Sequence, residues 1–237
     1  MEADIPGGSG KKNDEWVIEI IKMVERPEIE PSKQCRIYEV PHPLRKWNEE
    51  AYTPQVVSIG PFHHKNERLK AMEEHKERYF RSFLQRSKKN LEDLVGVIRD
   101  MEESIRGCYE ETIDLDSNGF VKMILLDAIF ILELFIRATS SEIRDDPNVV
   151  EPRVTTIIVD LLLLENQLPF FVIEKLYHLA FPNNSSSPSF IWLAFNFLES
   201  LYILRNPSDM EIQHFANLLR FFELPLPNQN LPYRSKK

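Results

Sequence analysis

Glycine is the residue that this chain lacks most clearly, with 7 among 237 residues against about 7% in average proteins. Loops that cradle phosphate groups depend on glycine. None of the motifs GxGxxG, GxxxxGK[ST], GxSxG and HExxH occurs in the sequence. We therefore expect neither nucleotide binding through a known glycine-rich loop nor any bound cofactor, and no common hydrolase signature is present.

Cysteine is almost as scarce, since Cys35 and Cys108 are the two in the chain. Two cysteines cannot build the disulfide framework of a small secreted domain. The first fifteen residues contain no apolar stretch of the kind that a signal peptide needs. These features favour a reducing, cytosol-facing compartment.

Positive charge in excess and uninterrupted apolar runs are also missing. The net charge of −8 argues against a nucleic-acid partner, because such proteins carry a basic surface. The two most apolar segments, 120–136 and 154–173, both contain charged residues, and each charge is costly at the centre of a bilayer. We therefore predict that both segments are buried core helices rather than membrane spans.

What the sequence has in quantity is apolar residues at helical spacing. They predict a mainly α fold, a helical bundle-like single domain over residues 13–224, between a disordered tail at 1–12 and a C-terminal tail at 225–237. Apolar residues alternate with polar ones in Cys35–Pro41 and Gln55–Gly60, which predicts a short two-stranded β element near residues 35–60. Proline, capping residues and periodicity place the helices at 14–25, 64–87, 90–108, 117–136, 152–164, 169–181, 190–204 and 208–224.

Three side chains carry chemistry that could serve catalysis or metal binding. His63 and His64 are adjacent, but no further pair of ligands at compact spacing completes a zinc site. We expect them to hydrogen-bond the loop onto the following helix. Cys108 lies on the apolar stripe of its helix, where a free cysteine is ordinary core material. We predict no catalytic residue, no cofactor-binding residue and no metal site.

Polar residues within apolar surroundings form the second group of candidates. Buried carboxylates need partners, and carboxylates with perturbed pKa values sometimes mark active sites. We expect these groups to pair with arginine or histidine, or to bind the free ends of helices. The residues predicted to form this structural polar network are His63, His64, Asp127, Asp160, Glu165, Asn166 and Gln167, and the candidate arginine partners are Arg36, Arg45, Arg137 and Arg153.

Several blocks of the sequence resemble, in order, the plant domain of unknown function 247. The opening blocks are CRIYEVPHPLRKWNEEAYTPQVVSIGPFHH and LKAMEEHKERYFRSFLQR. The later ones are IRGCYEE, DSNGFVKMILLDAIFILELF, DLLLLENQLPFFVIEKLY and IQHFANLLRFF. The resemblance covers roughly residues 15–224.

The resemblance implies a mainly helical land-plant protein with no established catalytic activity or cofactor. Some members of that family are associated with pollen–stigma self-incompatibility recognition. Members are typically about twice this length and end in a membrane anchor, with the domain facing the cytosol. Lys65 stands where the family usually has glycine, and the chain stops before the second half. The resemblance therefore predicts a truncated member that is itself cytoplasmic.

Three functions compete on these observations. The leading hypothesis is a non-enzymatic recognition or scaffold protein whose protein partner and oligomeric state the sequence does not reveal. The first alternative is a hydrolase or transferase that uses Cys108, or His63 and His64, with buried carboxylates. The second alternative is a peripheral binder of anionic lipid through the basic helix at 65–89.

Overall fold

The computed structural model of the chain describes residues 13–24, 35–140, 142–146, 151–182, 188–198 and 212–218. The chain divides into two compact units, Met1–Glu30 and Pro31–Lys237. The predicted limits of a single domain at 13 and 224 remain predictions. Residue 224 and both predicted tails, 1–12 and 225–237, lie outside the described residues.

The described part of the first unit is one amphipathic helix, α1 (Asn13–Val24). It agrees with the helix predicted at 14–25. Its apolar side chains, Trp16, Val17, Ile18, Ile20, Ile21 and Val24, are exposed.

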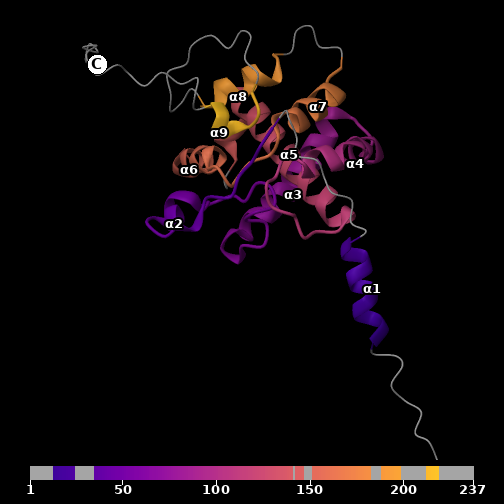
Figure 1. Cartoon of the computed structure of the whole chain (residues 1–237). Helices are drawn as coiled ribbons and strands as arrows, with labels where there is room; N and C mark the ends of the chain where they lie inside the picture. Colours follow the sequence, from indigo (N-terminus) through magenta and orange to yellow (C-terminus); the bar gives the residue numbers. More distant parts are fainter. Residues whose placement is uncertain are drawn as a thin grey trace, which may run out of the picture. The chain divides into compact units, whose positions relative to one another are not determined.

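The second unit is built around one long helix. α5 (Ser117–Thr139) begins at Asp116, whose side chain accepts a hydrogen bond from the backbone N–H of Gly119, as expected of an N-cap. It packs against α3 (Ala71–Ser87), α4 (Leu91–Arg106), α7 (Phe170–Ala180) and α8 (Phe190–Leu198), which surround it in Figure 1. Because α5 has neighbours on every side, most of its side chains are buried, as its nearly continuous apolar sequence predicts.

The remaining elements are shorter. They are α2 (His42–Arg45), α6 (Glu151–Leu162) and α9 (Phe215–Leu218), with 3-10 turns at Glu49–Tyr52, Glu67–Leu69 and Glu142–Asp145. The mainly α prediction is confirmed. Among the described residues, no helix is both long enough and apolar enough to cross a membrane.

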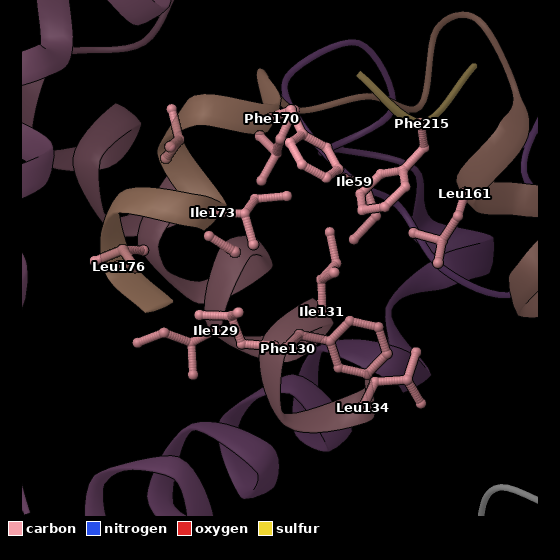
Figure 2. Close-up of a cluster of buried hydrophobic side chains, with 14 of the residues drawn as sticks. Ile59, Ile129, Phe130, Ile131, Leu134, Leu161, Phe170, Ile173, Leu176 and Phe215 are labelled. Carbon is pink, nitrogen blue, oxygen red and sulfur yellow. The ribbon is translucent and has the colours of Figure 1, made fainter. Parts of the chain in front are cut away.

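The core is rich in aromatic and branched side chains from α5, α6, α7 and α9. Figure 2 shows Phe170 and Phe215 gathered near Ile131 of α5, with Ile59 from the segment that precedes α3. The ring centroids of Phe170 and Phe215 lie 5.6 Å apart in an edge-to-face arrangement, a favoured geometry for aromatic pairs. Chain segments far apart in sequence therefore share one core.

The predicted two-stranded β element is wrong. Ile37 instead forms one isolated parallel bridge with Tyr109. The second segment, Gln55–Gly60, forms no strand, and its backbone N–H groups bind side chains of Asp127, Asp160 and Asn166 instead. Alternation of apolar and polar residues cannot say which groups will bind the backbone of a segment, and here those groups are side chains.

The helix predicted from His64 begins later than expected. Residues 67–69 form a 3-10 turn, and α3 starts at Ala71. The side chain of Asn66 accepts a hydrogen bond from the backbone N–H of Arg68 at 3.1 Å. Such a local bond competes with helix formation, which explains the delayed start.

Candidate functional site

The most distinctive feature of the second unit is a cluster of five buried polar side chains, four of which bind the backbone of residues 40–60. Most of them come from the loop that joins α6 to α7. Five of the predicted residues meet around this segment, Asp127, Asp160, Glu165, Asn166 and Gln167, and all five are buried. We call this set the polar hub.

Asp160 and Asn166 hold the segment Gln55–Gly60. The carboxylate of Asp160 accepts from the backbone N–H groups of Gln55, Val56 and Val57 at 2.7–2.9 Å. Asn166 accepts from Ile59 N–H at 2.7 Å, and its amide donates to the carbonyl of Val57 at 2.9 Å. Burial raises the pKa of Asp160 above its ordinary value, although the three N–H donors oppose that shift.

The hub also closes the end of α6. The amide of Asn166 donates to the carbonyl of Asp160 at 3.0 Å. The amide of Gln167 donates to the carbonyls of Leu161 and Leu163 at 2.7 and 2.5 Å. The carbonyls at the end of a helix lack hydrogen-bond donors within it. The side-chain amides of Asn166 and Gln167 act as those donors.

Glu165 fastens the segment that carries α2. One oxygen of its carboxylate accepts from the backbone N–H of Val40 at 2.5 Å, and the other pairs with the guanidinium of Arg45. Nε2 of His63 lies 3.3 Å from that second oxygen but is not directed along a hydrogen bond. Burial lowers the pKa of His63, with the attraction of Glu165 opposing it. Nδ1 of His64 is buried and has no hydrogen-bond partner among the described residues.

Asp127 meets a partner that the sequence analysis missed. The ammonium group of Lys76 donates to Asp127 and Glu73 at 2.6 Å and to the carbonyl of Ser58 at 2.7 Å. Its three hydrogens therefore all have acceptors. Burial opposes the charge on Lys76, but the two carboxylates outweigh it and raise the pKa of the ammonium group. Burial likewise raises the pKa of Asp127, against the attraction of Lys76.

A signal for Lys76 was present in the sequence. The apolar stripe of α3 runs through Met72, Tyr79 and Phe83, and Lys76 occupies the same face, one turn from Met72. A lysine within an apolar stripe indicates a buried charge with a partner. Two of the four candidate arginine partners form ion pairs with buried glutamates. Arg45 pairs with Glu165, and Arg137 pairs with Glu133.

A second cluster joins α3 to α5 and to the turn at 142–145. Glu133, buried in α5, accepts from Arg86 at 3.2 Å and from Arg137 at 2.8 Å. Asp146 accepts from the hydroxyl of Tyr79 at 3.0 Å and pairs with Arg78 at 3.3 Å. These contacts occupy charged side chains of α3 that the sequence would place in solvent.

The basic segment 65–89 therefore offers less free charge than its sequence suggests. Buried charges are paired or hydrogen-bonded, and Lys76 is wholly buried. The basic side chains of this segment that form ion pairs are Lys70, Lys76, Arg78, Arg81 and Arg86. The lipid-binding hypothesis stays a prediction without support from this arrangement.

Cys108 is buried and is not part of a solvent-exposed site. It is 1% exposed, and its thiol donates to the carbonyl of Ser104 at 3.3 Å. Among the described residues, no group of three histidine, cysteine or acidic side chains is arranged to hold a metal ion. The chemistry visible in the polar hub is the binding of backbone groups by buried carboxylates and amides.

These features define a mainly helical domain organised by a buried polar hub. The chain belongs to the family DUF247, described as "Plant protein of unknown function", whose model matches residues 37–236. Two Arabidopsis thaliana proteins are similar to it. UPF0481 protein At3g47200 is 39% identical over 150 residues, and Putative UPF0481 protein At3g02645 is 30% identical over 170 residues.

The matches cover 61% and 68% of this chain but 31% of each relative. The chain thus spans about a third of the length of the curated relatives that it matches. No solved structure matches the chain.

Proposed function

We propose that the chain is a non-enzymatic recognition or scaffold protein that binds a protein partner through the surface around α2. The observation that carries this proposal is Trp47, which is 89% exposed although a polar hub holds its segment in place. Tryptophan is a costly residue to leave in water and the residue most enriched at the energetic centres of protein interfaces.

Trp47 is accompanied by other exposed apolar side chains on the two segments that Glu165 joins. Leu44 lies in α2, Tyr38 precedes it, and Leu164 precedes Glu165 itself. We call Tyr38, Leu44, Trp47 and Leu164 the α2 surface. Exposed apolar groups of this kind mark interaction sites when they gather in one region.

The anchoring of this surface supports recognition by a preformed site. Glu165 is buried and binds both the backbone of Val40 and the side chain of Arg45, on either side of the start of α2. A segment held in one conformation loses less entropy when it binds a partner. The resemblance described above implies a recognition role for some members of the family, and we assign that kind of role to the α2 surface.

The test uses the whole chain with a photo-crosslinking amino acid at position 47. The matched control carries the same group at position 192, where Trp192 is also exposed on the second unit. Extracts of plant membranes and reproductive tissue supply the candidate partners. We expect position 47 to give a reproducible protein adduct that position 192 does not give. In pull-down experiments, the double variant L44A/W47A should fail to capture the same protein.

Two results would contradict the proposal. One is the absence of any reproducible adduct at position 47. The other is equal capture of the same proteins by the unmodified chain, by L44A/W47A and by W192A, since the α2 surface would then contribute nothing.

A further inference from the structure

One carboxylate oxygen of Glu165 lies against two basic side chains. Oε2 pairs with the guanidinium of Arg45, and Nε2 of His63 lies 3.3 Å from the same oxygen. The carboxylate is 1% exposed, whereas the side chains of His63 and Arg45 are 10% and 21% exposed. Nε2 of His63 is buried and has no hydrogen-bond partner among the described residues. With the histidine neutral, the glutamate and the arginine balance each other as one ion pair.

Protonation of His63 changes this balance, because the ring then carries a positive charge and an N–H at both nitrogens. Two cations then share one buried carboxylate, and a buried charge without a full partner is costly. The groups that face the ring are Arg45 from α2, Glu165 from the loop after α6 and the backbone of Tyr52 from the 3-10 turn at 49–52. Burial and the charge of Arg45 lower the pKa of His63, and they outweigh the carboxylate and the backbone, which raise it. The folded chain with its arginine in place therefore resists the proton.

Arg45 is the cation that can leave at the lower cost, because its guanidinium lies nearer to solvent than the histidine ring. It belongs to α2, a helix of four residues, and so short a helix is not stable by itself. The backbone N–H of Arg45 donates to the carbonyl of Pro41 at 3.1 Å, and that of Trp47 donates to the carbonyl of Leu44 at 3.2 Å. Loss of the pair with Glu165 therefore loosens the turn that positions Trp47.

We propose that His63 is a proton-controlled switch for the α2 surface, in which the protonated ring takes the place of Arg45 at Glu165 and releases α2. The inference rests on the proposed function in one respect, since the surface that it controls is the partner-binding surface. With the ring neutral, Arg45 is bound and Trp47 is held ready for a partner. With the ring protonated, the surface is loosened and binds its partner more weakly. The change takes place in mildly acidic solution, where a histidine gains its proton.

Hydrogen exchange of the full chain without a partner tests the switch directly. The amides of residues 42–48 are followed at about pH 7.5 and about pH 5.5, and each rate is divided by the intrinsic rate at that pH to give a protection factor. We expect these protection factors to fall at least about threefold on acidification, and by no more than about tenfold per pH unit because one proton is bound. His63→Gln carries no titratable group at this position, so its protection factors should not change with pH.

Three further variants separate this switch from other effects of pH. His178 also lies near a glutamate, with Nε2 3.9 Å from Glu174, but its side chain is 63% exposed, so His178→Gln is the matched control. His42→Gln removes the histidine of α2 itself, and both variants should keep the full response to pH. Arg45→Met removes the competing cation. In R45M the amides of residues 42–48 should exchange quickly at both pH values, and the NMR titration midpoint of His63 should rise.

Protection factors that do not fall on acidification, or that fall equally in H63Q, would overturn the inference. So would an unchanged midpoint of His63 in R45M, since the two cations would then not compete. None of these measurements uses a partner, so their failure is distinct from the absence of a crosslink at position 47. Where that crosslink forms, its yield should fall at about pH 5.5 in the unmodified chain and hold in H63Q, and equal yields in the unmodified chain at both pH values would contradict the switch.

Discussion

The ammonium group of Lys76 lies 2.6 Å from the carboxylate of Asp127, and both side chains are closed to solvent. The pair joins α3 to α5, and Asp127 also accepts from the backbone N–H of Gly60 at 2.8 Å. Two helices and the segment Gln55–Gly60 thus meet at one buried charge pair. Such a pair is costly to break because the remaining charge has no solvent.

Lys76→Met should therefore destabilise the protein by about 3–5 kcal/mol, measured by urea unfolding. The control is Lys70→Met, whose ammonium group is exposed in the same region, and it should cost less than about 0.5 kcal/mol. The double variant K76M/D127N should recover part of the loss, because asparagine keeps an acceptor for Gly60 without a buried charge. Equal stability of K76M and K70M would show that the buried pair contributes little.

Gly60 and Gly96 give a matched pair of substitutions with opposite expected signs. Gly60 has a φ of +76°, and a Cβ at this position would overlap the carbonyl oxygen of Gln167. Gly96 lies within α4, where a Cβ would meet nothing within 4 Å. Gly60→Ala should lower the free energy of unfolding by about 2 kcal/mol or more, whereas Gly96→Ala should raise it by roughly 0.5–1 kcal/mol.

Thermal unfolding of both variants checks this prediction. A neutral Gly60→Ala would mean that the segment shifts away from Gln167 without cost. Hydrogen exchange at residues 59–61 would detect such a shift directly.

Asp160→Ala removes the acceptor of three backbone N–H groups. The N–H groups of Gln55 and Val56 can bind water in place of the carboxylate. Val57 is buried, so its N–H loses a partner that water does not replace. We expect a loss of about 2–3 kcal/mol and faster amide exchange at residues 55–57. Asp114→Ala, at an exposed aspartate, is the control and should change neither quantity. Unchanged exchange in D160A would show that this carboxylate does not hold the segment.

His63 makes stability depend on pH in a defined direction. Burial lowers its pKa in the folded chain below the ordinary value of 6.5, while Glu165 opposes the shift. Between the two pKa values the unfolded chain binds more protons than the folded one, so stability falls as the pH drops through this window. Its contribution is complete above the unfolded pKa.

Proton NMR of the His63 ring should therefore give a titration midpoint below 6.5. In urea unfolding at about pH 7.5 and about pH 5.5, His63→Phe should lose less stability on acidification than the unmodified chain. A midpoint above 6.5, or a steeper loss in the variant, would contradict the assignment.

Local sequence predicted much of the helical scaffold because its signals are local. The apolar run of α5 and the capping residues Asp116 and Asn90 act within a turn or two of the chain. The polar residues of the loop after α6 were also recognised as candidates, since groups such as Asn166 and Gln167 are out of place in an apolar stretch. Their hydrogen-bond partners lie elsewhere in the sequence and could not be read from it.

The segment Gln55–Gly60 shows the limit of what a local sequence pattern can predict. Its alternation is the same whether its N–H groups face a strand or a row of side chains, so the predicted β element was a reasonable but wrong expectation. The pairing of Lys76 with Asp127 is similar, because neither residue carries information about the other. Contacts of this kind exist only once distant segments are packed together.

The sequence by itself therefore predicted the long helices of the scaffold, their buried faces and the family to which the chain belongs. The tertiary structure alone decided which carboxylate binds which backbone segment and how Glu165 holds the segment around Trp47. The physical reason is that helix formation depends on neighbours along the chain. A buried polar group is instead defined by neighbours in space.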